Sequence, residues 1–275
     1  MVDTLDKKQL VQLLPDIHRI AKEAGKIIME VYEQGFDIEI KEDESPVTTA
    51  DLAANTHIVN ELNKLSFIFP ILSEESEKVP FEERAKREAY WLVDPLDGTK
   101  EFIKHSDNFT VNIALIYKNK SILGVIYAPA LDVSYLATKG NGSYKQIANE
   151  ALSQIKVRKI SGPTIFACSS SHPGKALKTF LNDYEEEHGA YELISMGSSL
   201  KMCMVAEGSA DLYPRLWLTS EWDTAAAHCI VDEAGGQLVK TDMSPLLYNT
   251  KDSLLNPFFL TIGANDIDWV KFIPE

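Results

Sequence analysis

Three apolar segments follow one another between residues 109 and 138, and only short polar turns separate them. They read FTVNIALIY (109–117), SILGVIYA (121–128) and VSYLAT (133–138). Their length and their content of β-branched and aromatic residues are typical of strands. A turn of a few residues can join antiparallel neighbours, whereas a parallel crossover needs a dozen residues or more. The sequence therefore predicts consecutive antiparallel strands in the first half of the chain.

Two helices are expected before these strands. Apolar residues recur every three or four positions over residues 6–34, which predicts a long amphipathic helix that ends at Gly35. A second helix is expected to start near Thr49 and to bury Leu52 among its apolar residues. Asp51 would lie in its first turn, where the helix dipole favours a carboxylate.

After about residue 155, helical and strand patterns alternate, which is typical of a layered α/β arrangement. A soft boundary there divides the chain into two regions without a flexible linker. The first, residues 1–155, is expected to be an α+β region with the antiparallel sheet and the metal-binding acids. The second, residues 156–275, is expected to be an α/β region with the nucleotide-binding segment.

The overall charge narrows the partners that this chain can have. Its 41 acidic and 27 basic residues give a formal net charge of −14. That charge argues against nucleic-acid polymers and anionic membranes as main partners, although a bound cation can reverse the field inside a cleft. A weak peripheral association with the inner face of a membrane stays open.

The three cysteines form no CxxC motif, which argues against a disulfide framework or a zinc site and favours a reducing, cytoplasmic compartment. No apolar segment has the pattern of a signal peptide or the length of a membrane span.

The strongest chemical signal is the motif DPLDGT, residues 94–99, which directly follows the apolar run YWLV. Two aspartates three residues apart on a turn can face one point, and the carbonyl of Leu96 lies between them. Mg²⁺ prefers such oxygen ligands, with water and a substrate phosphate completing its octahedron. Taken alone, the motif also has the composition of an ordinary Asp-Pro/Asp-Gly turn.

Two further acids stand at the ends of predicted elements. Glu74 follows an apolar run, and Asp223 opens a predicted helix after Trp222. Each has a simpler explanation, Glu74 as part of a solvated charge pair and Asp223 as a helix-capping acid. Several clustered carboxylates would repel one another, and a divalent cation would offset that repulsion.

The order of these motifs resembles the inositol monophosphatase superfamily of metal-dependent, lithium-sensitive phosphatases. SPVTTAD (45–51), LSEES (72–76), WDTAAAH (222–228) and the continuation KEFI after DPLDGT are similar, more narrowly, to the CysQ-type 3′(2′),5′-bisphosphate nucleotidases. So is the block GSSLKMCMVAEGSADLYPR. The similarity runs from about residue 17 to residue 262. It implies an αβαβα sandwich with a mainly antiparallel first sheet and a second sheet in the C-terminal half.

The resemblance also implies a metal site and a set of catalytic residues. Two Mg²⁺ ions would be held, and the resemblance leaves open a third, weaker one near the attacking water. The implied metal ligands are Glu74, Asp94, the Leu96 carbonyl, Asp97 and Asp223. The implied catalytic residues are Asp51, which orients or activates the water, Thr99, which assists by hydrogen bonding, and Glu75, which supports Thr99 unless it is a surface charge.

Residues 197–201, GSSLK, stand at a predicted helix start, where backbone N–H groups suit a phosphate. Lys201 adds a positive charge, and Arg215 can clamp a second phosphate bidentately. The simpler explanations are N-capping serines and solvated surface cations. By resemblance, the expected substrate contacts are Glu74, Leu96, Asp97, Gly98, Thr99, His172, Ser198, Lys201, Arg215 and Asp223.

The implied reaction is the hydrolysis of adenosine 3′,5′-bisphosphate to AMP and phosphate by a monomer or homodimer. 3′-Phosphoadenylyl sulfate would be a second substrate, sulfate assimilation the context, and lithium an inhibitor. One alternative is an inositol or sugar phosphatase of the same superfamily. Another is a non-catalytic nucleotide-binding regulator, which would have no need of a water-activating Asp51.

Overall fold

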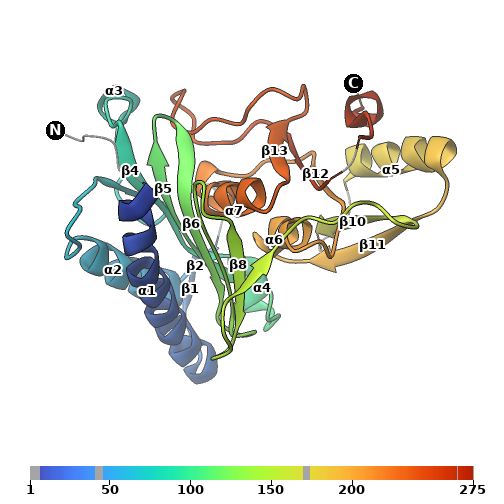
Figure 1. Ribbon diagram of the computed structural model, residues 1–275. Helices are drawn as coiled ribbons and strands as arrows, with labels where there is room; N and C mark the ends of the chain where they lie inside the picture. The colour runs from blue at the N-terminus through green and yellow to red at the C-terminus, as the bar shows by residue number, and fades with distance from the viewer. Residues whose placement is uncertain (1–6, 41–45, 170–173, 265, 275) are drawn as a thin grey trace.

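Helices and sheets alternate in five layers in the computed structural model, which describes residues 7–40, 46–169, 174–264 and 266–274 (Figure 1). Helices α1 (Lys7–Gln34) and α2 (Thr49–Leu62) cover one face of a seven-stranded sheet. Helices α6 (Leu200–Ala206) and α7 (Glu221–Glu233) separate it from a five-stranded sheet. Helix α5 (Lys175–His188) covers the outer face of that second sheet. The expected αβαβα sandwich is confirmed.

The seven-stranded sheet has the order β3-β4-β5-β6-β7-β8-β9, and every neighbouring pair except β3–β4 is antiparallel. The three strands expected over residues 109–138 are β5, β6 and β7. Lys118 and Asn119 both have positive φ, as a two-residue hairpin turn between antiparallel strands requires. Strands β8 and β9 were not predicted. The bounds are β3 Ile71–Ser73, β4 Ala89–Asp97, β5 Thr110–Tyr117, β6 Lys120–Ala128, β7 Val133–Thr138, β8 Ser143–Ile147 and β9 Ser153–Ile155.

The five-stranded sheet has the order β11-β10-β12-β14-β13, with β10 parallel to both of its neighbours and the other pairs antiparallel. Strand β11 was not predicted, because its alternation is weak. The bounds are β10 Thr164–Ser169, β11 Tyr191–Met196, β12 Leu212–Arg215, β13 Gln237–Lys240 and β14 Phe259–Ile262.

Five short elements complete the chain. A two-stranded hairpin precedes α2, α3 lies between the first two strands of the large sheet, and α4 begins directly after the DPLDG segment. A 3-10 helix packs near α5 at the C-terminal end. The bounds are β1 Ile38–Ile40, β2 Pro46–Thr48, α3 Phe81–Arg84, α4 Thr99–Ile103 and η1 Trp269–Phe272.

The periodic apolar face of α1 is buried as expected, but the expectation for Leu52 in α2 is wrong. The side chain of Leu52 is 45% exposed. Helix α2 turns Ala50, Ala54, Ile58 and Leu62 toward the sheet, and these residues repeat every four positions. Leu52 lies about half a turn away from that row, so it faces solvent.

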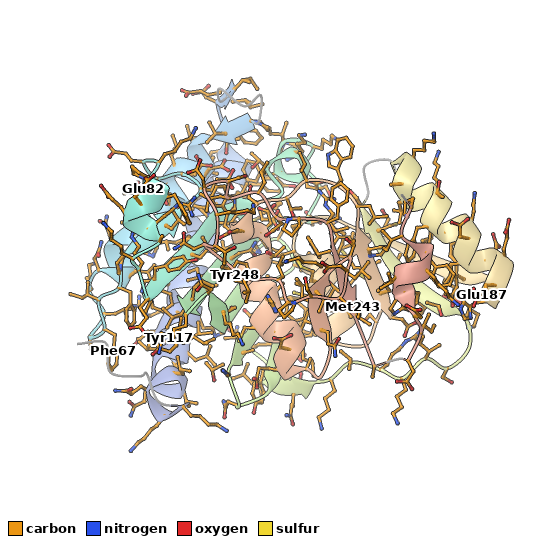
Figure 2. The ribbon with its side chains drawn as sticks, turned by 90° about the horizontal axis from the view of Figure 1, so that it is seen from above. Phe67, Glu82, Tyr117, Glu187, Met243 and Tyr248 are labelled. Atoms are coloured by element: carbon orange, nitrogen blue, oxygen red, sulfur yellow. The ribbon has the colours of Figure 1, made fainter. Side chains whose placement is uncertain are left out.

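The two halves of the chain share one core. Residues of α7 pack against β4 to β8 of the first sheet, although α7 belongs to the second half of the sequence. The division near residue 155 therefore stays a prediction. Viewed from above, side chains fill the space between the layers, from Phe67 at one end to Glu187 on α5 at the other (Figure 2). None of the described helices has the length and the apolar character that a membrane crossing needs.

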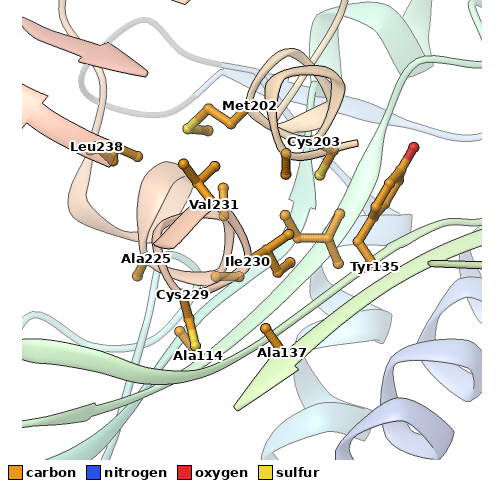
Figure 3. Packing of buried hydrophobic residues seen from close by; sticks show 14 of the residues in the cluster. Ala114, Tyr135, Ala137, Met202, Cys203, Ala225, Cys229, Ile230, Val231 and Leu238 are labelled. Carbon is orange, nitrogen blue, oxygen red and sulfur yellow. The ribbon is translucent and has the colours of Figure 1, made fainter. Parts of the chain in front are cut away.

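Helix α7 approaches the first sheet unusually closely because small residues line the contact. Ala114, Gly124 and Ala137 stand side by side on three adjacent strands. Ala225 and Cys229 of α7 face this row (Figure 3). A Cβ atom at Gly124 would lie 2.1 Å from the carbonyl oxygen of Ala226, so only glycine fits there.

Candidate active site

Three aspartates meet where strand β4 passes the start of helix α7. One carboxylate oxygen from each of Asp94, Asp97 and Asp223 lies within 4.8 Å of the others. Asp94 pairs with Asn112 and Asp97 with Thr110, so β4 has one more residue than β5 over this stretch. In a regular strand, residues three apart point to opposite faces. This β-bulge removes the alternation and lets both aspartates face one point.

Glu74 lies beside this group because β3 and β4 are parallel neighbours. Ser73 pairs with Val93, so the next residues along the two strands, Glu74 and Asp94, are adjacent at the strand ends. The Glu74 N–H donates to the Val93 carbonyl at 3.1 Å. The charge of Glu74 also helps to raise the pKa of Asp94. Four of the predicted metal-binding acids are therefore close together.

Asp51 and Thr99 reach the site from the opposite side of the sheet. The Asp51 Oδ2 atom accepts hydrogen bonds from the Thr48 N–H at 2.8 Å and from its hydroxyl at 2.6 Å. The Thr99 Oγ1 atom lies 3.2 Å from Asp51 Oδ1 and 3.3 Å from the Leu96 carbonyl oxygen. Burial raises the pKa of Asp51, while these hydrogen bonds oppose the shift.

The acids are costly to keep ionised without a cation. Burial, together with the charges of neighbouring carboxylates, raises the pKa of Asp94 and of Asp223 well above the usual range. Burial also raises the pKa of Asp97, and Lys201 opposes that shift. The donor set consists of oxygen atoms, which suits a hard divalent cation such as Mg²⁺. The described residues therefore fit the metal-dependent chemistry of the motif.

A cavity of about 810 Å³ opens next to the acids, with Asp97 and Asp223 on its wall. Lys201 and Arg215 also line it. Lys201 is only 6% exposed and donates to the Ser198 carbonyl at 2.7 Å. Burial lowers the pKa of Lys201 to about 8, although Asp97 opposes the shift. A nearly buried cation facing a cavity with acids on its wall suits an anionic ligand held beside a metal.

Two polar atoms on the cavity wall lack partners in the described part of the chain. They are the Ser198 hydroxyl and Arg215 Nε, both buried. Leaving a buried donor without a partner costs on the order of 1–3 kcal/mol. Arg215 uses another nitrogen, Nη2, to donate to the Leu218 carbonyl at 3.0 Å. Both unsatisfied groups therefore belong to residues at the place where a ligand would be held.

The serines before α6 do not cap that helix through their side chains, so the N-capping explanation is wrong. The Ser199 hydroxyl is bonded instead to Thr110 and Asn112, each at 2.9 Å. The Ser199 N–H donates to Asp97 Oδ2 at 2.6 Å. The segment therefore positions a carboxylate of the aspartate group as well as lining the cavity.

Close backbone approach holds this segment against the DPLDGT loop. A Cβ atom at Gly197 would lie 2.6 Å from the Asn108 carbonyl oxygen, and one at Gly98 would lie 3.2 Å from the same atom. Gly98 also has a φ of 93°, which starts α4 directly after Asp97. The two glycines thus bring together loops that lie about a hundred residues apart in the sequence.

The remaining predicted residues are placed as follows. Glu75 is half-buried behind the site, and its carbonyl accepts from Asn55 at 3.3 Å; its role stays a prediction. His172 lies outside the described residues. His228 bonds to the Tyr248 hydroxyl at 2.9 Å and packs against its ring in the core.

Asn112 was missed by the sequence analysis, although it holds Asp97 at 3.3 Å. Its signal is visible in the sequence, since it is the one amide in an otherwise apolar strand. Trp217 and Phe258 also line the cavity and were not predicted, because neither belongs to a recognisable sequence motif.

Comparison with known proteins places the chain among phosphatases. The family model described as the inositol monophosphatase family matches residues 10–264. The chain is 44% identical over 249 residues to the 3′(2′),5′-bisphosphate nucleotidase CysQ of Escherichia coli strain K12, covering 90% of this chain and 98% of that protein. It is 37% identical to the nucleotidase CysQ of Haemophilus influenzae, covering 94% and 95%.

Solved structures agree with the observed layers. CysQ from Bacteroides thetaiotaomicron is 38% identical and superposes with a TM-score of 0.81, covering 96% of this chain and 100% of that one. An IMPase from Thermotoga maritima is 24% identical, with a TM-score of 0.74 and coverage of 93% and 94%. The second similarity extends to the fold alone.

Proposed function

Because the chain belongs to the inositol monophosphatase family, we propose that it is a 3′(2′),5′-bisphosphate nucleotidase that hydrolyses adenosine 3′,5′-bisphosphate to AMP and phosphate. One observation carries the proposal beyond the family. The cavity joins the aspartate group to a buried lysine, and its wall includes Ser198 and Arg215, each of which has a buried polar atom without a partner among the described residues. A substrate with two phosphates needs both ends, because one phosphate reacts and the other is only held.

The proposed cofactor is Mg²⁺, two ions with a third, weaker one near Asp51. Glu74, Asp94, the Leu96 carbonyl, Asp97 and Asp223 would hold the first two. When bound, Mg²⁺ supplies positive charge to the phosphate oxygens and makes water a stronger acid. The raised pKa values of the buried aspartates support this proposal, because a cation offsets the repulsion among them.

The chain's own residues orient the attacking water. The Thr99 hydroxyl can donate its hydrogen to Asp51 Oδ1, which leaves an oxygen lone pair to accept a hydrogen bond from water. Asp51 is itself fixed by two hydrogen bonds from Thr48. The water oxygen bonds to phosphorus as the bond to the ribose oxygen breaks, and the proton that the water gives up passes to the ribose oxygen, which leaves as the alcohol.

Lys201 and Arg215 would hold the phosphate that does not react. Lys201 donates to the Ser198 carbonyl, which keeps its charged end at the cavity wall. Arg215 retains a buried Nε–H with no partner among the described residues. Gly98 and Ser198 would contact the ligand through backbone and hydroxyl groups. By the family resemblance, His172, which lies outside the described residues, would contact the ribose or base.

We extend the proposal to 3′-phosphoadenylyl sulfate as a second substrate and to a cytoplasmic enzyme that clears a by-product of sulfate assimilation. The described acids carry no sulfate-specific contact, so this extension depends on the shared 3′-phosphate. It would be tested by comparing phosphate release from the two nucleotides at equal concentration.

The deciding experiment measures phosphate release from adenosine 3′,5′-bisphosphate and from inositol 1-phosphate in parallel. Each substrate is assayed with Mg²⁺, with chelator and with lithium. We expect Mg²⁺-dependent, lithium-sensitive preference for the nucleotide. Preference for inositol phosphate would overturn the substrate, and activity that survives the chelator would overturn the metal mechanism. Tight nucleotide binding without turnover would identify a regulator.

A further inference from the structure

Two aromatic side chains line the cavity and remain exposed. Trp217 is 69% exposed and Phe258 is 43% exposed. Leu218 next to Trp217 also lines the cavity and is exposed. Large apolar side chains grouped at the opening of a polar cavity are typical of a binding surface, because leaving them in water is unfavourable.

Main-chain pairing places Trp217 and Phe258 on neighbouring segments of the chain. On one side of them, Arg215 pairs with Phe259 where β12 meets β14. On the other side, Ser220 forms a bridge with Leu255 in the same antiparallel sense. Trp217 and Phe258 lie between these two pairings, on segments that run alongside each other. Their positions are therefore fixed by main-chain pairing on both sides.

The neighbouring groups show which part of a ligand the rings can take. Asp97, Asp223 and Lys201 occupy one part of the cavity wall, and Arg215 stands two residues before Trp217. Charged groups thus suit the phosphates, and the apolar wall is left for a flat, uncharged group. A nucleotide has its phosphates, ribose and base in this order. A cavity of about 810 Å³ lies within the range that holds such a ligand.

We infer that Trp217 and Phe258 stack against the purine base of the substrate and thereby select nucleotides over phosphorylated polyols. The inference rests on the proposed function and adds a specificity determinant to it. Every base offers a π-face, whereas inositol offers only hydroxyl groups, so stacking on the rings would favour the nucleotide alone.

The experiment compares ligands that differ only by the base. AMP and ribose 5-phosphate are used as competitive inhibitors of the wild-type protein and of the variants Trp217→Ala and Trp217→Phe. Because Trp217 is exposed, neither variant should unfold the protein. We expect Trp217→Ala to weaken the binding of AMP ~10-fold and to leave the binding of ribose 5-phosphate unchanged. Trp217→Phe should keep most of the affinity for AMP. Leu193→Ala on β11, also exposed but away from the cavity, is the matched control.

A second readout does not depend on turnover. Trp91 and Trp269 are buried, Trp222 is half-buried against the core, and Trp217 is exposed, so AMP stacking on Trp217 would quench tryptophan fluorescence and Trp217→Phe would remove that change. If Trp217→Ala weakens the binding of AMP and of ribose 5-phosphate equally, or leaves AMP binding unchanged, the inference is overturned. If AMP quenches the wild-type fluorescence but the nucleotide is not hydrolysed, the proposed function fails and the base contact stands.

Discussion

Asp51 and Asp223 hold equivalent positions in two helices that approach the site from opposite faces of the seven-stranded sheet. Each is the third residue of its helix, and each closes a capping box with the residue before that helix, Thr48 or Ser220. In both, Oδ2 accepts the capping backbone N–H, at 2.8 Å and 2.9 Å. The cap holds one carboxylate oxygen and leaves the other free to face the site, so the capping role of these acids is confirmed and their catalytic and metal-binding roles stay predictions that are compatible with it.

Asp51→Asn should abolish most of the activity while leaving the fold intact. The amide oxygen can still accept from Thr48, but the charge that orients Thr99 is lost. We expect kcat to fall by ~100-fold or more, with the thermal midpoint of unfolding changed by only a few degrees. Phosphate release and thermal unfolding check this. Asp242→Asn, which makes the same change in an exposed turn, should stay active; an active Asp51→Asn would contradict the assigned role.

Asp94→Asn should stabilise the metal-free protein while removing activity. The folded-state pKa of Asp94 is raised, so its ionisation at neutral pH disfavours the folded state, and this cost falls as pH falls through that pKa. A neutral amide avoids the cost and can still accept from the Leu96 N–H, which lies 3.0 Å from Asp94 Oδ1. In chelator the thermal midpoint should rise by ~2–4 °C, and added Mg²⁺ should raise it less than in the wild type. A lower midpoint in chelator would show that the carboxylate is stabilising without metal.

Gly197→Ala should separate the α6 segment from the loop at Asn108. The added methyl would start 2.6 Å from the Asn108 carbonyl oxygen, and relief of that overlap would move the Ser199 N–H away from Asp97. We expect a stability loss of about 1–3 kcal/mol and a ~10-fold lower kcat/KM. Gly174→Ala, where a methyl meets open space beside the same cavity, is the matched control. Equal behaviour of the two variants in urea unfolding would refute the packing argument.

His228→Gln should make the protein more resistant to acid. Burial lowers the pKa of His228 from 6.5 to about 4, so the folded state resists protonation that the unfolded state accepts. Above pH 6.5 His228 is neutral in both states and costs no stability. As pH falls from 6.5 toward 4, the unfolded state gains a proton that the folded state does not, and the free energy of unfolding decreases. Glutamine keeps a partner for Tyr248 and cannot titrate, so it should spare on the order of 3 kcal/mol at pH 4. The acid-unfolding midpoint, followed by circular dichroism, should move to lower pH, whereas His188→Gln on α5 should leave it unchanged.

Local patterns were enough to predict much of the fold. The short turns near Lys118 and Asp132 already required antiparallel neighbours, and the period of α1 identified its buried face. The exposure of Leu52 depends on which face of α2 packs against the sheet, and β11 forms because it pairs with β10. Neither could be predicted from the local sequence, because both depend on residues far away along the chain.

In the candidate site, too, some features could be predicted from local sequence and others depend on distant partners. Each acid could be found because it stands at the end of an apolar strand or in the first turn of a predicted helix. The bulge that turns Asp94 and Asp97 to one side depends on pairing with β5, and the partners of Ser199 lie about ninety residues away. Roles for Glu75 and His172 stay predictions.

The absent side chain at Gly124 sets a dimension of the metal site. Helix α7 carries Asp223, while strand β4 carries Asp94 and Asp97, and the contact of α7 with the sheet decides how far apart these ligands lie. Even one methyl group at Gly124 would lift the helix, and Asp223 with it, and the octahedral geometry of the proposed Mg²⁺ would tolerate such a shift poorly. The spacing of these three carboxylates is therefore set by a hydrogen atom in the core, at a position with no chemistry of its own.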